Sequence, residues 1–455
     1  MTRQNRPYLF HDTTTAICTT CLRPAEGKVL LREEGVVLEK WCPAHGFERV
    51  PISDDVAWYR MAREVYVKSP ELPRRFATSM EHGCPYDCGL CPDHMQHSCV
   101  TVLEVTDHCN LRCPVCYADS GPERGSHRPL AVIERMLDAI VASEGDPDVV
   151  QISGGEPTLH PEFFAILDAA RARPIRHLMV NTNGLRIGRD PAFVERLASY
   201  GPGLEVYLQF DSLQEGPLRA LRGADLREVH ARALAALEAS GLSTTLVMTL
   251  ARGLNDGEVG DVIRHALGFR CVRGVTLQPV QHAGRTEGPG VAAGRLTVSG
   301  VRRLVAEQSG LFTLADVLPV PCNPDTLAMA YALKLGGEVT PLTRFLAPED
   351  LLAGPRNTIV FERDPALRER LFALFSTNHS PETQARRLSD LLCCLPRVEA
   401  AGLSYENVFR VLVVQFMDAS NLDVRALKKS CIHMVQPDGR MIPFEAFNVF
   451  HRDGR

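Results

Sequence analysis

The sequence of 455 residues contains no long apolar run and no long run of basic residues. No apolar stretch approaches the ~18 residues of a membrane span, so we expect a protein that does not cross the membrane, although peripheral membrane contact is compatible with this composition. The first residues, MTRQNRPYLFHDTTT, lack the apolar core of a signal peptide, which favours a cytoplasmic location. The net charge of −5 argues against a nucleic-acid partner.

Cysteine, by contrast, is abundant, with 15 residues in the chain. Thiols stay reduced in the cytoplasm, where clustered cysteines more often bind metal than form disulfides. Apolar residues make up 45% of the sequence and charged residues 23%, which is enough for a sizeable core. The sequence therefore predicts a folded metalloprotein, and its length favours two or three domains.

Strand and helix patterns alternate between residues 100 and 297. Six apolar runs read as buried strands: VTVLEVT, DVVQIS, HLMVNT, LEVYLQF, TTLVMT and RGVTLQP. Between them lie amphipathic helices; in LAVIERMLDAIVAS one face carries Ile133, Met136, Leu137, Ile140 and Val141. This alternation predicts an α/β fold with parallel strands, a partial (β/α)6 TIM-type barrel whose ligands bind at the carboxyl ends of the strands.

We expect four regions along the chain. Residues 1–78 form an N-terminal mononuclear metal-binding domain with a hairpin over 28–41, and residues 79–99 form an auxiliary iron–sulfur segment. The partial barrel follows over 100–297. Residues 298–455 are expected to form an α+β extension that covers the substrate, with a helix over 328–335 and a strand in VFRVLVVQFM lining an apolar groove.

The segment HCNLRCPVCYAD follows the first barrel strand and holds three thiols, Cys109, Cys113 and Cys116. Thiolates suit zinc or iron–sulfur clusters. Three cysteines on a [4Fe–4S] cluster leave one iron open, where a small molecule can bind. The alternative is a zinc knuckle that lacks its fourth ligand.

Polar groups follow the other strands at the same face. The turn in QISGGEPTLHP contains Gly154, Gly155 and Glu156; the glycines permit close backbone approach to a ligand, and the carboxylate can accept a hydrogen bond from an ammonium group. Further candidate cofactor-binding residues at strand ends are Asn181, Asn183, Gln209, Asp211 and Gln278, and in the loop after the last strand His282 and Arg285. Capping of strand ends explains such residues equally well.

Three further cysteine groups are candidate metal sites. CPYDCGLCPDHMQHSC contains Cys84, Cys88, Cys91 and Cys99, which we interpret as ligands of an auxiliary [4Fe–4S] cluster, with zinc as the alternative. Two knuckles with Cys18, Cys21, Cys42 and His45 indicate a zinc-ribbon or rubredoxin-like site for zinc or iron. Cys322, Cys394 and Cys431 either converge as a second auxiliary cluster or are buried core thiols.

The Cys-x3-Cys-x2-Cys loop after strand one and the Gly-Gly-Glu-Pro turn after strand two resemble the radical S-adenosylmethionine (SAM) superfamily over about residues 100–290. The resemblance implies that Cys109, Cys113 and Cys116 bind a cluster whose open iron chelates SAM, and that the glycine turn binds the SAM amino group. It also implies reductive cleavage of SAM to a 5′-deoxyadenosyl radical, with an electron donor such as ferredoxin or flavodoxin. Val115 departs from the family pattern, where an aromatic residue precedes the third cysteine.

The order of the motifs resembles, over nearly the whole chain, a narrower group that includes an archaeal tetraether lipid synthase and a methanogen pterin dimethyltransferase. This resemblance implies attack on an unactivated C–H bond of a small-molecule or lipid substrate, with carbon–carbon coupling of lipid chains as the first hypothesis. Methyl transfer to a pterin-like ring is the second hypothesis, and a non-enzymatic iron–sulfur carrier or sensor the third. Ser430 and Glu445 stand where relatives are expected to have cysteines.

Overall fold

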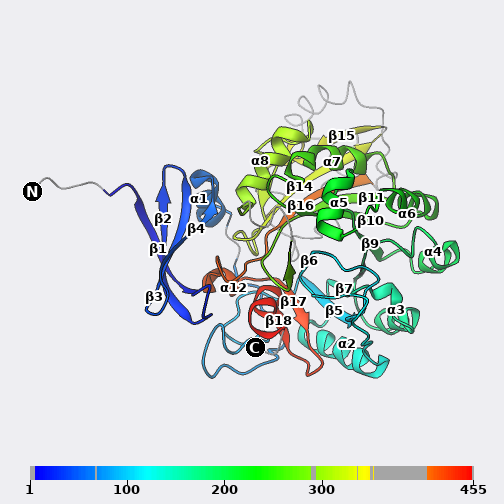
Figure 1. Cartoon of the computed structure of the whole chain (residues 1–455), viewed down its shortest axis with the longest axis horizontal. Coiled ribbons are helices and arrows are strands. Elements are labelled where there is room, and N and C mark those ends of the chain that lie inside the picture. Colours follow the sequence, from blue (N-terminus) through cyan, green and yellow to red (C-terminus); the bar gives the residue numbers. More distant parts are fainter. Residues whose placement is uncertain are drawn as a thin grey trace, which may run out of the picture.

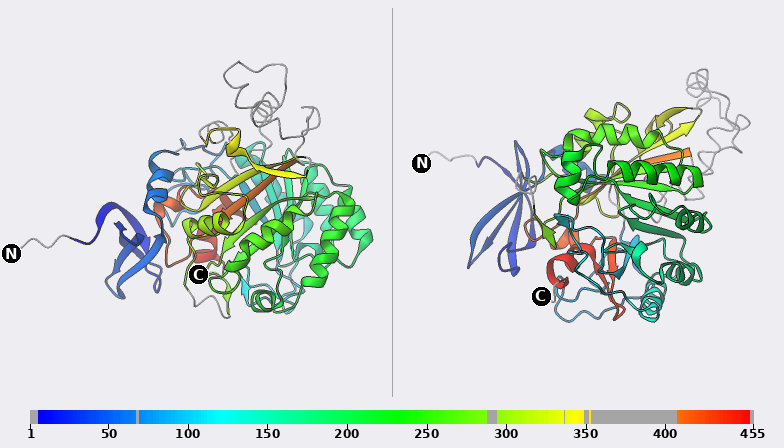
Figure 2. Two further views of the ribbon diagram at one scale, coloured as in Figure 1. Left: turned by 90° about the horizontal axis from the view of Figure 1, so that it is seen from above. Right: turned by 45° about the vertical axis from the view of Figure 1, so that its right-hand side comes forward.

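The computed structural model describes residues 6–66, 69–287, 294–335, 337–348, 352 and 407–452. Within them the chain forms a small N-terminal sheet and a large sheet flanked by helices (Figure 1). The small sheet projects from one side of the larger body, as the two further views also show (Figure 2). The fold is therefore built around two main sheets, and a third sheet in the described chain has only two short strands.

The N-terminal sheet is antiparallel and its strands follow one another in chain order. Its strands are β1 (Leu9–Ile17), β2 (Pro24–Arg32), β3 (Gly35–Cys42) and β4 (Gly46–Ser53), followed by helix α1 (Val56–Glu64). β2 and β3 confirm the hairpin predicted over 28–41. Val29, Val36 and Leu38 pack with Ala16 and Tyr59 in a small core of their own.

The large sheet has 12 strands in the described part of the chain, in the order β13-β14-β16-β11-β10-β9-β8-β7-β5-β17-β18, with β15 on β14. The six predicted barrel strands are β5 (Val100–Thr106), β7 (Val149–Gly154), β8 (His177–Thr182), β9 (Leu204–Gln209), β10 (Thr244–Leu250) and β11 (Val272–Pro279). Neighbours among these six are parallel. The prediction of an α/β fold with a partial barrel is confirmed, because this sheet ends in two edges, β13 and β18.

Helices connect the parallel strands and cover the outer face of the sheet (Figure 1). They are α2 (Leu130–Glu144), α3 (Phe163–Arg171), α4 (Pro191–Ala198), α5 (Glu215–Arg222), α6 (Arg227–Ser240), α7 (Val259–Leu267) and α8 (Val298–Gln308), with short turns η1 (Pro157–Leu159) and η2 (Asp256–Glu258). The predicted apolar face of α2 is largely buried, at Ile133, Met136, Leu137 and Ile140. Helices and sheet thus share one continuous hydrophobic core.

The C-terminal part of the chain extends the large sheet at both edges. Its elements are β13 (Leu318–Pro319), β14 (Leu327–Leu335), β15 (Glu338–Pro341), η3 (Leu342–Arg344), β16 (Val408–Val414), α12 (Val424–Leu427), β17 (Ile432–Val435), β18 (Met441–Pro443), α13 (Phe444–Ala446) and η7 (Phe447–His451). β16 lies parallel to β11, and β17 lies parallel to β5.

The helix predicted over 328–335 is wrong, because this segment forms strand β14. Leucine and alanine favour a helix, but tertiary pairing with β16 overrides this weak preference. The large residues Leu327, Met329 and Tyr331 point into one core, and the alanines between them point into the other. The alternation of large and small residues with a period of two was the signal for a strand.

A buried ion pair lies at the floor of the barrel. Arg410 on β16 donates to Glu205 on β9 at 2.6 Å, and the His177 ring lies 3.0 Å from the same carboxylate. All three side chains are at most 5% exposed. The Arg410 charge and the His177 hydrogen bond overcome the effect of burial and lower the pKa of Glu205 below its usual range. The ion pair thus fills the barrel interior near the start of β9.

A search of the described residues finds no helix that is both long enough and apolar enough to cross a membrane.

Candidate active site

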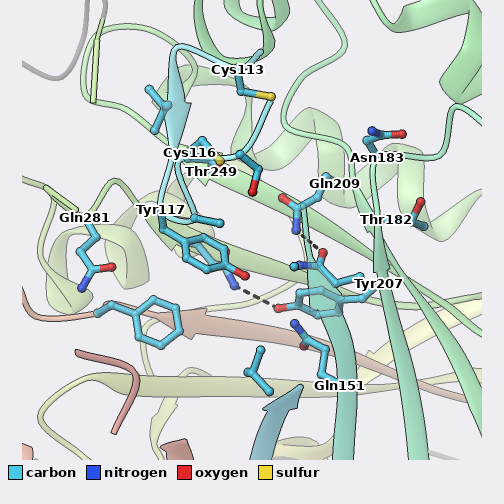
Figure 3. A pocket seen from close by; sticks show the side chains of 18 of the residues that line it. Cys113, Cys116, Tyr117, Gln151, Thr182, Asn183, Tyr207, Gln209, Thr249 and Gln281 are labelled. Carbon is cyan, nitrogen blue, oxygen red and sulfur yellow. Dashed lines mark hydrogen bonds between the residues drawn. The ribbon is translucent and has the colours of Figure 1, made fainter. Parts of the chain in front are cut away.

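A cavity of about 180 Å³ lies at the carboxyl ends of the parallel strands (Figure 3). All three thiols of the first cysteine loop border it, together with the glycine turn after β7 and amide side chains from several strands. Phe416, Phe444 and Ile432 of the C-terminal part complete the wall. The motifs that lie far apart in the sequence therefore converge on one cavity.

The cysteine loop is fixed at its back by the loop that follows β11. Its short strand β6 (Val115–Cys116) pairs with β12 (Arg285–Thr286). Arg285 donates to the Cys113 carbonyl at 2.6 Å and to the Ser120 carbonyl at 2.6 Å, so it clamps the loop instead of facing the cavity. Gly284 lies so close that a Cβ atom there would be 2.5 Å from the Cys116 carbonyl oxygen.

Two of the loop thiols are buried and have altered acidity. Burial raises the pKa of Cys109 to about 12. Burial also raises the pKa of Cys113, against the opposing charge of Arg222. A bound metal deprotonates such thiols outright. The three thiols that border the cavity, two of them buried, thus have the donor chemistry for an iron–sulfur cluster with one open iron.

The glycine turn forms the base on which the cysteine loop rests. Gly155 N–H donates to the Thr106 carbonyl at 2.8 Å, and Glu156 N–H donates to the His108 carbonyl at 2.8 Å. Gly154 has φ of +126°, and a Cβ atom at Gly155 would be 2.2 Å from the His108 carbonyl oxygen. Only glycine permits this contact, which brings the turn and the loop together beside the cavity.

Glu156 borders the cavity but is bound mainly by the protein itself. One carboxylate oxygen accepts from the Thr158 hydroxyl at 2.6 Å and the Thr182 hydroxyl at 2.8 Å, and the other accepts from Asn183 N–H at 2.8 Å. Burial raises the pKa of Glu156, while these hydrogen bonds oppose the shift. The oxygen that accepts only from Asn183 N–H can therefore accept a further hydrogen bond, as the predicted contact with the SAM amino group requires.

The predicted amides at the strand ends do meet at the cavity. Asn181, Asn183, Gln209 and Gln278 all border it. Gln209 donates to the Asn181 side-chain carbonyl at 2.7 Å, as the dashed line in Figure 3 shows. Asn183 donates to Asn110 of the cysteine loop at 2.8 Å. These residues form a polar layer directly beneath the loop.

Asp211 differs from the prediction, because it is fully buried behind the wall and does not border the cavity. Arg222, which the sequence analysis missed, donates to Asp211 at 2.8 Å and to Gln209 at 2.9 Å. Arg222 itself borders the cavity and acts electrostatically on Cys113. It comes from the end of α5, and no local pattern distinguishes it from the other arginines of the chain.

His282 is also placed differently from its expected role. Its side chain is 49% exposed and faces Asp418, with the ring 3.7 Å from that carboxylate. The preceding residue, Gln281, borders the cavity and donates to the Met417 carbonyl. From the end of β11 and the loop that follows it, Gln278 and Gln281 therefore border the cavity, and His282 does not.

Three residues deeper in the cavity were also missed: Tyr117, Gln151 and Tyr207 (Figure 3). The Tyr117 hydroxyl is 3.1 Å from the Ser153 hydroxyl, and its ring packs on Phe444 at 5.0 Å. Gln278 donates to the Tyr207 hydroxyl at 3.1 Å. Gln151 and Tyr207 occupy inward positions of β7 and β9, which strand periodicity could have indicated.

Apolar residues that were expected to line a groove lie in the cavity wall. Leu412, Val414 and Phe416 from the predicted VFRVLVVQFM segment do border the cavity. However, the same wall carries Gln151 and Tyr207, and the inward positions below them lead to the Glu205–Arg410 pair. The wall formed by the described residues is thus largely apolar, as expected, and it also carries hydrogen-bonding groups.

The N-terminal knuckles meet at one end of the small sheet. His45 Nδ1 lies 3.4 Å from Cys18 Sγ and 3.5 Å from Cys42 Sγ, and Cys21 Sγ lies 3.9 Å from Cys42 Sγ. Burial raises the pKa of Cys18, but the backbone N–H groups of Cys21 and Thr20 outweigh it and lower the pKa to about 6. Tetrahedral zinc with S and N ligands at about 2.0–2.3 Å fits this spacing.

The remaining cysteines group differently from the prediction. Cys84, Cys88 and Cys91 surround a small cavity of their own, which Cys99 does not border. Cys99 instead lies with Cys322 and Cys431, and their three sulfurs are within 4.8 Å of one another. This grouping arises from long-range contacts, which spacing in the sequence cannot reveal. Cys394 lies outside the described residues.

Comparison with known proteins identifies the class. The model of the radical SAM superfamily matches residues 103–266, and the model of the HMPTM N-terminal zinc ribbon domain matches residues 10–54. The chain thus contains a radical SAM domain over residues 103–266, and it is a radical SAM enzyme. Members use a [4Fe–4S] cluster and SAM, and the additional cysteine groups and the zinc ribbon match indicate further metal sites.

Among individual proteins, the chain is 28% identical to the 7,8-dihydro-6-hydroxymethylpterin dimethyltransferase of Methanocaldococcus jannaschii, over 96% of this chain and 94% of that protein. It is 33% identical to the GTP 3′,8-cyclase of Geobacter sulfurreducens over 39% of this chain and 54% of the cyclase. The solved structure of Streptococcus suis SuiB with S-adenosylmethionine aligns with a TM-score of 0.39 and 18% identity over 46% of each chain.

Proposed function

We propose that this enzyme transfers a methyl-type carbon to a compact, pterin-like ring bound beside Cys109. The relative that matches nearly the whole chain carries the name of a dimethyltransferase of such a ring. A cluster held by Cys109, Cys113 and Cys116 would supply, with SAM, a 5′-deoxyadenosyl radical that removes a hydrogen atom from carbon. A second SAM molecule would donate the methyl group. With two electrons from a low-potential ferredoxin or flavodoxin, each turnover would replace one ring C–H bond by C–CH3 and release S-adenosylhomocysteine, 5′-deoxyadenosine and methionine.

The side-chain amide of Gln151 is the observation that favours a pterin-like ring as the substrate. It borders the cavity among Val102, Met179 and Leu412, and among the described residues none forms a hydrogen bond with it. A primary amide offers a donor and an acceptor side by side, which match the N–H and C=O edge of a pterin. A hydrocarbon chain in this place would leave the amide unpaired, at a cost of about 1–3 kcal/mol.

The neighbouring groups fit a flat ring with a polar edge. Tyr207 Oη is bound to the Gln278 amide, so that a second hydrogen-bonding group lies beside Gln151. Met179 and Val102 offer apolar surface to the faces of the ring. Glu205 is the next inward-facing residue of β9 below Tyr207, and it is paired with Arg410. This charged pair would not provide an apolar surface for a lipid chain at that place.

The residues nearer the mouth would hold SAM. By the strand registers Asn181 lies two residues above Gln151, and Gln209 and Gly155 lie four residues above it, roughly 7 Å and 13 Å closer to the cysteine loop. This separation divides the cavity into an upper part for SAM and a lower part for the ring. Tyr117, between the two parts, would exclude water from the reacting carbon, as radical chemistry requires.

The test is a direct assay of the reduced, anaerobically reconstituted enzyme with SAM and 7,8-dihydro-6-hydroxymethylpterin. Mass spectrometry should find the methylated pterin together with 5′-deoxyadenosine. Gln151→Leu should raise KM for the pterin about tenfold, because one buried hydrogen-bonding group is lost. Met179→Leu, a change of similar size in an apolar residue of the same wall, is the matched control.

Two results would contradict the proposal. One is coupled or otherwise modified lipid chains, with no pterin product, when both substrates are offered. The other is methylated pterin formed equally well by wild type and Gln151→Leu, which would remove the lower part of the cavity from ring binding.

A further inference from the structure

Three buried thiols form a tight group at the end of the barrel opposite the active site. Cys99 precedes β5, Cys431 precedes β17, and Cys322 follows β13. Cys322 Sγ and Cys431 Sγ are 3.9 Å apart, and all three sulfurs lie within 4.8 Å of one another. We name this group the floor thiols. At most 6% of any of the three residues is exposed.

The spacing of the floor thiols distinguishes one metal ion from a cluster. A single tetrahedral ion with Zn–S bonds of about 2.3 Å holds its sulfurs roughly 3.8 Å apart. In an iron–sulfur cluster each thiolate binds a different iron, which spreads the sulfurs farther. The floor thiols have the separation expected for a single ion.

The chain itself provides a comparison for this argument. Among the described residues, only the floor thiols and the zinc-ribbon group Cys18, Cys21, Cys42 and His45 bring three or more ligand atoms within 4.8 Å of one another. The active-site loop, which we assign to a cluster, does not. By spacing, the floor thiols resemble the zinc ribbon and differ from the cluster loop.

A buried acidic side chain, Glu445, also lies near the floor thiols. Glu445 is 2% exposed, and one of its oxygens accepts a hydrogen bond from the Ser430 hydroxyl at 2.8 Å. Its charge acts on Cys431. In the described part of the chain no Lys, Arg or His lies within ion-pair distance of Glu445. Burial raises the pKa of Glu445 to about 7, which favours the neutral acid; a cation bound nearby would favour the carboxylate instead.

The polar neighbours of Cys99 also favour a metal-bound thiolate. The Gln96 amide donates to Cys99 Sγ at 3.8 Å, and His97 Nε2 lies 3.7 Å from the same sulfur. The other ring nitrogen of His97 lies 3.0 Å from the Glu144 carboxylate, which fixes the ring. Such outer partners are typical of sites that hold a metal.

We propose that Cys99, Cys322 and Cys431 bind one divalent ion of the zinc type, separate from the iron–sulfur chemistry. On binding, the three thiols release their protons and the ion forms bonds with the three sulfurs. The ion ties the starts of β5 and β17 to the loop after β13. It thereby fastens the C-terminal part of the chain beneath the barrel, where Val100 and Ile432, the next residue of each strand, border the cavity.

The experiment measures zinc, iron and acid-labile sulfide per chain in the full-length, reconstituted protein. Wild type should contain about two metal ions without accompanying sulfide, one in the ribbon and one at the floor thiols. Cys431→Ser should lose about one of them, with sulfide unchanged. Cys18→Ser combined with Cys21→Ser should lose the other. Cys271→Ser, at a buried cysteine outside all groups, should lose none.

Either of two results would overturn the proposal. If Cys431→Ser loses about four irons with their sulfides, the floor thiols hold a cluster. If wild type contains only one sulfide-free ion and the double ribbon variant contains none, they are core thiols. This count on wild type and the ribbon variant decides the question even if Cys431→Ser does not fold.

Discussion

Two buried arginines at the two ends of the barrel make the same kind of ion pair with very different surroundings. At the floor, Arg410 pairs with Glu205 at the start of β9, and neither residue borders the active-site cavity. At the mouth, Arg222 pairs with Asp211 just after the end of the same strand and also borders the cavity beside Cys113. One strand therefore carries a carboxylate–arginine pair at each end.

The difference indicates what each pair does. The floor pair satisfies its own hydrogen bonds and fills the interior, so its contribution is to stability. The mouth pair uses Arg222 to hold Gln209 at 2.9 Å and Thr249 at 3.2 Å and to place a positive charge next to the cluster loop. We infer that changes at the mouth affect chemistry, whereas changes at the floor affect folding alone.

The largest effect is expected at the mouth, from Gly154→Ala. Gly154 has φ of +126°, and a Cβ atom would lie 2.2 Å from the Thr106 carbonyl oxygen, so the turn must move away from the cysteine loop. SAM cleavage should fall to background, measured as 5′-deoxyadenosine. Gly216→Ala, where a Cβ atom meets nothing within 4 Å, should leave the rate unchanged. Normal cleavage by Gly154→Ala would show that the close contact is dispensable.

The paired variants Arg222→Met and Arg410→Met test the comparison directly. Each leaves a buried carboxylate without its partner, which should lower the free energy of unfolding by about 3–5 kcal/mol. Only Arg222→Met should also lower SAM cleavage per folded, cluster-loaded molecule. Arg219→Met, at an exposed ion pair, should change stability by less than about 1 kcal/mol. Equal losses of specific activity in both variants would remove the distinction between mouth and floor.

A smaller, pH-dependent effect is expected from His230, which lies beneath the loop after β8. Burial lowers the pKa of His230 to about 4. The folded state disfavours the protonated ring. The free energy of unfolding is therefore unaffected by this group above about pH 6.5, and it falls at lower pH by up to ~1.4 kcal/mol per pH unit. His230→Phe should flatten the fall in unfolding free energy between about pH 6 and pH 4. His282→Phe, at an exposed position, should not.

Much of the barrel could be predicted because its signals are local. The six strands appear as apolar runs, and the cysteine loop and glycine turn follow the first two of them. Parallel strands bring their carboxyl ends to one face, so Gln209 and Gln278 could be placed at the cavity without coordinates. The strand β14 was mistaken for a helix because its alanines suggested helix propensity, whereas its pairing partner lies some 80 residues away.

The missed features depend on contacts between distant segments. Cys99 was assigned to the nearest cysteines, but Cys322 and Cys431 reach it only after β13 and β17 join the fold. Asp211 was expected at the cavity because it follows β9, but it is buried behind the cavity wall, where it pairs with Arg222. Spacing in the sequence identifies ligands that share a loop, and it does not identify those that the tertiary fold brings together.

The most direct test of the account is SAM cleavage by Cys113→Ala, measured as 5′-deoxyadenosine and methionine from the reduced, anaerobically reconstituted protein. Because Cys113 is proposed to hold the cluster whose open iron binds SAM, the variant should form neither product while the N-terminal ribbon keeps its metal ion. Cys271→Ala, at a buried cysteine away from the cavity, should cleave SAM like wild type. Formation of 5′-deoxyadenosine by Cys113→Ala at the wild-type rate would contradict the account.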